Sequence, residues 1–241
     1  MIMVWNWSDI WHFLVFQATP YAIVSILIVA SILRWVLAPY SWKTQSSQVL
    51  GSGGSLFVGA NLFHFGVVLL FCGHFFGLFT PKEWLDAVGL TPPIHQMTEV
   101  IMGGFAATLS ITGILILACR RWFNSRVRKS SRMSDHLVLI ILIFTLVFGL
   151  TSLLDGFFDD PSGVELVTFG NWAKALVTFQ PDAWKNMVDA PIWQKIHISL
   201  GLLVFLMVPF TRLIHIWSGF FSPTYLVRPH QIMRTSEKTY R

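Results

Sequence analysis

Residues 62–81 read LFHFGVVLLFCGHFFGLFTP, an apolar run that contains two histidines, His64 and His74, and no charged residue. A helix needs about 20 apolar residues to cross the hydrocarbon core of a bilayer, and this run has that length. Ionisable residues are costly inside a membrane and usually mark a functional site there. The stretch therefore predicts a transmembrane helix that carries two functional imidazoles.

The rest of the chain has the same character. Of its 241 residues, 54% are hydrophobic and only 12% are charged, which excludes an ordinary soluble domain. Five windows are long and apolar enough to span a bilayer: about 11–37, 57–79, 98–119, 135–154 and 194–217. The sequence predicts an all-α integral membrane protein, in which residues 1–241 form one bundle of five transmembrane helices.

The basic residues predict how the bundle is oriented. Between the third and fourth windows lie Arg120, Arg121, Arg126, Arg128, Lys129 and Arg132, with no acid before Asp135. Short loops rich in Lys and Arg stay in the cytoplasm, so we expect the N-terminus outside and the tail 218–241 in the cytoplasm. We therefore expect a multi-pass protein of the cytoplasmic (inner) membrane. The net charge of +5 follows from this topology and indicates no nucleic-acid partner.

Two further features follow from this topology. Cys72 and Cys119 fall towards opposite ends of the bundle, so we expect no disulfide between them. Residues 164–179 space their apolar side chains along one face of a helix, and we expect this amphipathic segment to lie along the outer surface of the membrane.

The fifth window also contains two histidines, His197 and His215. Because the second and fifth helices run in opposite directions, His74 and His197 share the outer level, whereas His64 and His215 share the inner one. The rises along the two helices differ, roughly 15 Å against roughly 27 Å, so tilt or a kink at Pro209 must absorb the difference. All four rings can face one interior.

Two facing histidines at each of two levels are typical of bis-histidine haem b, in which each imidazole supplies one axial ligand to the iron. Gly66, Gly73, Gly77 and Gly201 would give flat macrocycles room. Zinc is less suitable, since a tetrahedral site needs clustered ligands. A single histidine is as well explained by a hydrogen bond between helices, but four at matched depths favour haem.

The chain resembles the gamma subunit of respiratory nitrate reductase, a membrane cytochrome b. The similarity spans about residues 55–228 and is carried by NLFHFGVVLLFCGHFFGLFTP, RRWFNSRVR, LVTFGNWAKALVTF and PFTRLIHIWSGFFSPTYLVR. The resemblance implies two haems b and oxidation of membrane quinol near the outer haem. It also implies electron delivery through the inner haem to a cytoplasmic iron-sulfur subunit and a molybdenum-cofactor catalytic subunit.

Carried over by residue, the resemblance makes His74 and His197 the ligands of the outer haem, and His64 and His215 those of the inner haem. The family's quinol site uses a basic residue just before the third helix, commonly a lysine, and His95 stands there in this chain. His95 could accept a quinol proton, or it could be an ordinary polar loop residue.

Two further residues have roles to weigh. Gly73 would let the quinol head group approach, unless it serves only packing. Arg212 would neutralise a haem propionate, unless it snorkels to the membrane surface.

Two alternatives to this function remain open. The same type of cytochrome b could serve another complex, in sulfur metabolism or in quinone reduction. The chain could also be a haem-free membrane anchor. In every case the chain alone cannot reduce nitrate, because its two cysteines provide no cluster ligands.

Overall fold

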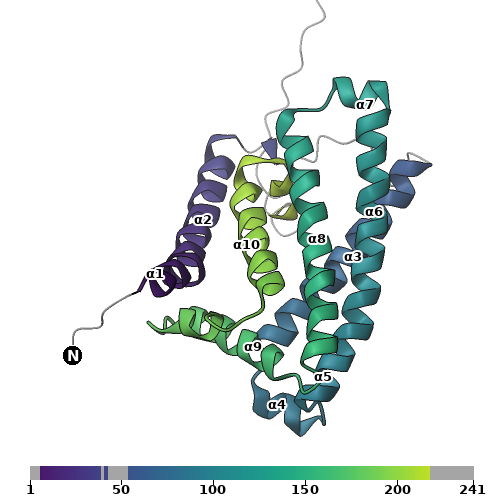
Figure 1. Ribbon diagram of the computed structural model, residues 1–241. Helices are drawn as coiled ribbons and strands as arrows, with labels where there is room; N and C mark the ends of the chain where they lie inside the picture. The colour runs from purple at the N-terminus through teal and green to yellow at the C-terminus, as the bar shows by residue number, and fades with distance from the viewer. Residues whose placement is uncertain (1–5, 39–40, 43–53, 218–241) are drawn as a thin grey trace, which may run out of the picture.

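The computed structural model describes residues 6–38, 41–42 and 54–217 (Figure 1). Within these residues, five helices are long and apolar enough to cross a membrane: Trp7–Leu37, Ser55–Phe79, Pro92–Phe123, Met133–Asp159 and Ile192–Phe210. The predicted number of spans is therefore confirmed. The predicted tail, 218–241, lies outside the described residues, and the orientation of the bundle remains a prediction.

The first span combines α1 (Trp7–Phe13), a π-helical turn η1 (Leu14–Ala18) and α2 (Thr19–Leu37). Asn6 and Asp9 cap its start by hydrogen-bonding to each other's backbone N–H groups. The π turn ends two residues before Pro20, whose ring would clash with the carbonyl of Phe16, within that turn, if the helix were a regular α-helix. The span begins before the predicted residue 11, because hydropathy does not register a polar capping turn.

The second span, α3 (Ser55–Phe79), packs along α6 (Gly104–Phe123) through small residues. A Cβ at Gly113 would collide with the backbone of Phe63, and one at Gly66 would collide with Ser110. Close backbone approach of this kind is how helices associate in membranes. The expectation that Gly66 makes room for a macrocycle is therefore wrong, since this glycine serves the contact between helices.

The third span starts earlier than predicted. After the short helix α4 (Lys82–Ala87), it consists of α5 (Pro92–Thr98), a π-helical turn η3 (Glu99–Gly103) and α6. The prediction placed its start at about residue 98, because the first turns contain too many polar residues to register as apolar. As a result, His95 lies on the span itself rather than in the loop before it.

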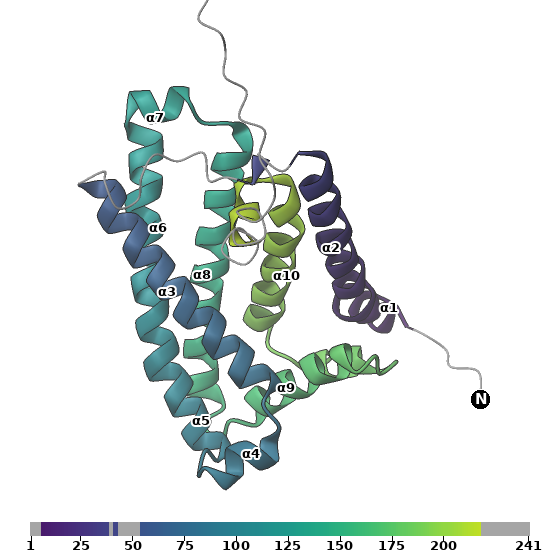
Figure 2. The same cartoon turned by 180° about the vertical axis from the view of Figure 1, so that it is seen from behind.

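The two ends of the bundle carry different short helices. One end carries α7 (Ser125–Lys129), which precedes the fourth span, α8 (Met133–Asp159); we call it the α7 end. The opposite end, the α9 end, carries α4, α5 and α9 (Val164–Val177), and both views show α9 running across the spans (Figures 1 and 2).

Residues 164–179 do form a helix over most of their length, but the apolar face of α9 is used inside the protein. Phe169, Trp172 and Ala173 are buried in a cluster with Phe16 of η1 and with η4 (Ala183–Met187). The indole N–H of Trp172 donates to the carbonyl of Phe16 at 2.9 Å. The helix thus closes the α9 end of the bundle rather than offering this face to lipid.

The predicted fifth helix, 194–217, is not continuous. The helix α10 (Ile192–Met207) gives way to two 3₁₀ segments, η5 (Val208–Phe210) and η6 (Arg212–Trp217). Pro209 lacks an N–H group and ends the regular helix. Arg34 of α2 stabilises the break by donating to the freed carbonyls of Pro209 at 2.7 Å and Thr211 at 2.9 Å.

Candidate functional site

The four histidines meet in two pairs between α3 and α10–η6. The ring centroids of His74 and His197 lie 6.0 Å apart, and those of His64 and His215 lie 5.9 Å apart. These are the partners that the depth argument predicts. The structure thus brings together all four residues that were assigned as ligands.

Both separations suit two ligands on opposite sides of one metal ion. An imidazole nitrogen binds a first-row metal at about 2 Å and lies about 1 Å from its ring centroid, so two such rings are about 6 Å apart. Each level holds two histidines, and the described residues contain no group of three or more His, Cys, Asp or Glu side chains able to hold a metal. The geometry fits an iron that takes its other four ligands from a porphyrin.

The hydrogen bonds of the four rings leave the correct nitrogen free. The Nδ1 atoms of His64 and His74 lie 2.7 Å from the carbonyl oxygens of Ala60 and Leu70, four residues earlier on α3. His215 Nδ1 lies 2.7 Å from the carbonyl oxygen of Arg212. Since a carbonyl only accepts, each Nδ1 carries the proton and each Nε2 keeps its lone pair. Metal-bound histidines are held in this way.

His197 is held from another helix. Its Nδ1 donates to the carbonyl oxygen of Thr145 on α8, at 3.0 Å. Gly149, one turn further along α8, makes room for the ring, because a Cβ there would lie 2.7 Å from His197 Cε1. Neither α8 residue was singled out from the sequence, since the contact joins positions that are far apart in the chain.

The break in α10 also accounts for the difference between the rise from His64 to His74 and the longer rise expected from His197 to His215. The separation of His64 and His74 on the continuous helix α3 is about 15 Å along its axis. A continuous helix from His197 to His215 would have moved the second pair out of register. The segments η5, which contains Pro209, and η6 instead bring His215 back towards His64.

Replacing Gly149 by alanine is expected to weaken the hold on His197. The added methyl group must displace the imidazole and break its bond to Thr145, and losing such a partner typically lowers metal affinity about 10- to 100-fold. We expect partial loss of one of two haems, measured by pyridine haemochrome on the purified protein. Gly104→Ala is the matched control, since its Cβ would make only an ordinary contact with Leu153 at 3.9 Å; equal haem content in the two variants would contradict this role.

The pair at the α9 end borders a cavity of about 460 Å³, a volume typical of cofactor and ligand sites. His74 and His197 line it, together with mainly apolar side chains of α3, α6 and α8. Gly73 lines it too, and a Cβ there would meet no atom within 4 Å. Gly73 is therefore placed where a ring-shaped ligand could approach α3 closely.

Polar side chains gather at the wall of this cavity nearest α5 and α9. They include His95, the predicted quinol residue, and Glu99, which sequence reasoning missed. The two are joined at 3.5 Å between His95 Nε2 and Glu99 Oε1. Glu99 is the only charged residue of the predicted window 98–119, and this was the signal that could have identified it.

A further carboxyl, that of Glu165 on α9, also lines the cavity. Burial, followed by the neighbouring carboxylates of Asp160, Asp155 and Asp159, raises the pKa of Glu165 above its usual value. The cavity wall at the α9 end therefore concentrates acidic groups.

Arg212 has a partner that the sequence did not indicate. Its Nε lies 2.8 Å from Asp135 Oδ1, and Arg121 of α6 lies 3.1 Å from the other oxygen of the same carboxylate. Asp135 is buried, with 4% of its side chain exposed, and it also accepts from the backbone N–H of Arg132. This ion-pair cluster ties α6, α8 and the turn that carries His215 together. The contact of Arg212 with a haem propionate remains a prediction.

Cys72 and Cys119 are both free thiols in the structure.

Comparison with known proteins covers nearly the whole chain. The profile of the family described as nitrate reductase gamma subunit matches residues 12–236. Over 216 residues the chain is 34% identical to the respiratory nitrate reductase 2 gamma chain of Escherichia coli, covering 90% of this chain and 93% of that one. It is 33% identical to the nitrate reductase gamma chain of Bacillus subtilis, covering 89% and 94% of the two chains.

A more distant similarity points to a second kind of complex. Over 181 residues, the chain is 29% identical to an Hdr-like menaquinol oxidoreductase cytochrome b-like subunit of Archaeoglobus profundus. The match covers 70% of this chain and 49% of that protein.

Proposed function

The chain belongs to the nitrate reductase gamma subunit family, and from that premise we propose that it is the quinol-oxidising dihaem cytochrome b of a respiratory nitrate reductase. The observation that carries the proposal is the pair of facing imidazoles at each of two levels, with every Nδ1 proton committed to a carbonyl. His74 and His197 would hold one haem b, and His64 and His215 the other. When bound, the haems supply a one-electron relay along the bundle.

The direction of the relay follows from the charge distribution. The basic residues around α7 predict that the α7 end faces the cytoplasm and the α9 end faces outside, in the inner membrane. His64 and His215 then lie on the side where an iron-sulfur subunit and a molybdenum-cofactor subunit would receive electrons. The anchoring of those subunits is supported by the family and by the exposed basic side chains at this end.

The quinol site is proposed at the α9 end, in the part of the cavity near Gly73 and His95, beside the haem that His74 and His197 would hold. Its apolar walls suit a quinol ring and isoprenoid chain, and its polar groups are concentrated at one side, where the hydroxyls would bind. At the α7 end, Arg212 would face a propionate of the haem held by His64 and His215. Arg212 would at the same time remain paired with Asp135.

A second candidate is the same type of cytochrome b in another quinol-linked complex. The similarity to the Archaeoglobus subunit favours it, since that protein is named as part of a menaquinol oxidoreductase. The nitrate reductase assignment is better supported, because those relatives match along almost their whole length. Copurification of the subunits that the chain recruits distinguishes the two.

The proposal predicts about two haems b per chain. A dithionite-reduced minus oxidised spectrum with pyridine-haemochrome quantitation measures this on the purified protein. Anaerobic addition of menadiol should reduce both haems, and it should not reduce them if the chain only anchors its partners. A preparation without haem would leave the haem-free anchor, and one haem per chain would show that one pair has been misassigned.

A further inference from the structure

The structure places an acid, Glu99, beside His95 at the wall between two cavities. Its side chain is 33% exposed, and that of His95 is 14% exposed. Glu99 begins the π-helical turn η3, where the helix widens from the regular α-helical path. Such turns are frequent at functional sites, because they redirect a side chain at a small energetic cost.

The carboxylate of Glu99 reaches across to α3 at Gly77. A Cβ on Gly77, which follows His74 by three residues, would lie 2.6 Å from Glu99 Oε1 and 3.7 Å from His95 Nε2. Gly77 thus lets the Glu99 carboxylate approach α3, whereas His95 would make only an ordinary contact with a side chain there. Both also line the large cavity that His74 and His197 border.

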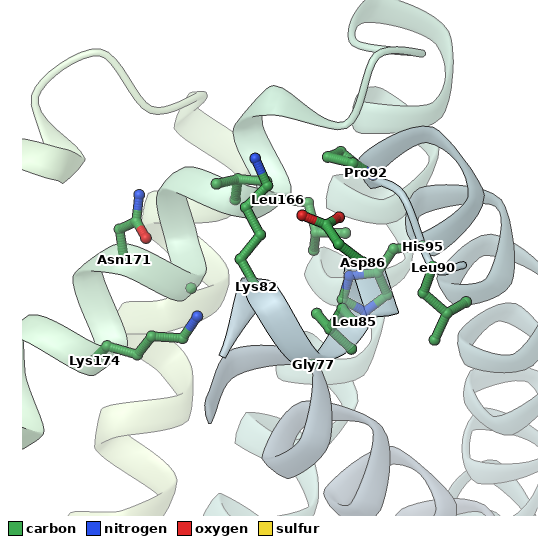
Figure 3. Close-up of a pocket in the computed structure, with 12 residues that line it drawn as sticks. Gly77, Lys82, Leu85, Asp86, Leu90, Pro92, His95, Leu166, Asn171 and Lys174 are labelled. Atoms are coloured by element: carbon green, nitrogen blue, oxygen red, sulfur yellow. The ribbon is translucent and has the colours of Figure 1, made fainter. Parts of the chain in front are cut away.

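On its other side, His95 borders a second, smaller cavity of about 30 Å³. This volume holds one or two water molecules. Its wall includes Lys82 and Asp86 of α4 and Asn171 and Lys174 of α9, and Figure 3 shows their polar ends around the same space as His95. The small cavity therefore joins His95 to polar groups at the α9 end of the bundle.

We propose that Glu99 and His95 accept the protons that quinol releases in the large cavity, and that the small cavity carries these protons to the α9 surface. This inference rests on the proposed function. Oxidation of one quinol breaks two O–H bonds and gives one quinone, two protons and two electrons. The haem that His74 and His197 would hold would accept the electrons, and the protons need bases in contact with the hydroxyls.

The placement of the two groups suits a relay. A quinol hydroxyl transfers its proton to a Glu99 carboxylate oxygen, forming a neutral carboxyl group. That group passes the proton to His95, 3.5 Å away, and His95 passes it to water in the small cavity. The second hydroxyl repeats the sequence once the carboxylate is restored.

Several charged groups face this pair and set its pH dependence together. They are Lys82 and Asp86 of α4, Asp155 of α8, and Glu165 and Lys174 of α9. The two lysines border the small cavity beside His95, whereas Asp155 and Glu165 border only the large one. A proton that moves from the large cavity to the small one thus leaves a region lined by carboxylates. It enters a region lined by both basic and acidic side chains.

The test is the rate of haem reduction by menadiol in membranes that contain the assembled complex, followed by anaerobic stopped flow between pH 5 and pH 9. Glu99→Gln keeps the size of the side chain but cannot accept a proton. We expect the maximal rate of haem reduction to fall about 100-fold at neutral pH, with little change in haem content or in the menadiol concentration that gives half of that rate. The wild-type rate should fall at low pH, because the proton acceptor becomes protonated. This decrease of the rate at low pH should be absent in the variant.

Two variants complete the design. Glu99→Asp retains a proton acceptor in a shorter side chain and should recover part of the rate, which a purely structural role would not explain. Glu83→Gln makes the same chemical change on exposed α4, away from both cavities, and should behave as wild type.

The outcomes separate the two proposals. Failure of menadiol to reduce the wild-type haems would overturn the proposed function itself. Reduction of Glu99→Gln at the wild-type rate and with the wild-type pH profile would overturn only the role of Glu99.

Discussion

Replacement of His197 by alanine is expected to lower the haem content from about two to about one haem b per chain and to abolish haem reduction by quinol. His197 supplies one Nε2 lone pair to the pair with His74, and its Nδ1 is committed to Thr145. Alanine removes that ligand and leaves His74 without a partner across the cavity. Since quinol is proposed to bind beside this level, the remaining pair at the α7 end should receive no electrons from it.

The measurements for this variant are haemochrome quantitation, the low-temperature α-band spectrum and quinol-driven reduction. Dithionite should still reduce the remaining haem, which shows that the other pair has kept its ligands. His136→Gln is the matched control, because His136 lies outside both pairs and accepts a hydrogen bond from Trp122 that glutamine can also accept. A His197 variant with two haems per chain and unchanged spectra would show that the pairing does not hold a haem.

Replacement of Asp135 by alanine is expected to destabilise the protein by about 3 kcal/mol and to disturb the haem at the α7 end. Removing one partner of a buried ion pair costs about 3–5 kcal/mol, because the remaining charges lose their compensation. We take the lower value, since the side chains of Arg121 and Arg212 are 24% and 25% exposed and water can solvate them in part.

The effect on haem follows from position. Arg212 contributes the carbonyl that holds His215 Nδ1, and its own side chain is held by Asp135. Loss of the carboxylate frees the turn, so the haem held by His64 and His215 should change its reduction potential or be lost. The other haem should be unaffected.

The measurements for Asp135→Ala are a redox titration and the temperature at which the detergent-solubilised protein loses haem. Asp182→Ala is the matched control, since Asp182 pairs with Lys185 at the surface, where such pairs contribute at most about 1 kcal/mol. Equal loss of stability in the two variants would show that the ion pairs of Asp135 do not stabilise the protein as the structure indicates.

Much of the architecture can be predicted from local sequence patterns. Hydrophobic length alone predicts the five spans, because each must match the thickness of a bilayer regardless of its neighbours. The depth of each histidine follows from its distance along a helix, so the pairs His64–His215 and His74–His197 could be predicted before any contact was known. The limits of these patterns appear at helix ends, where polar turns such as Pro92–Thr98 continue a span beyond its apolar part.

Other features depend on residues that meet only after the chain has folded. Pro209 indicates a kink, but the turn that brings His215 to His64 also requires Arg34 from the first span and Asp135 from the fourth. The orientation of the His197 ring depends on the carbonyl of Thr145 and on the space left by Gly149, both on α8. The position of Glu99 next to both His95 and α3 requires the π turn and the absence of a side chain at Gly77.

The sequence by itself therefore determined which helices cross the membrane and which histidines share a level, because hydrophobicity and helical rise act along one segment at a time. The tertiary structure alone decided which carbonyl holds the ring of His197, how His215 reaches its partner and which helix the Glu99 carboxylate approaches. Each of these depends on hydrogen bonds or close packing, whose energies act only over a few ångströms and between segments that the chain brings together by folding.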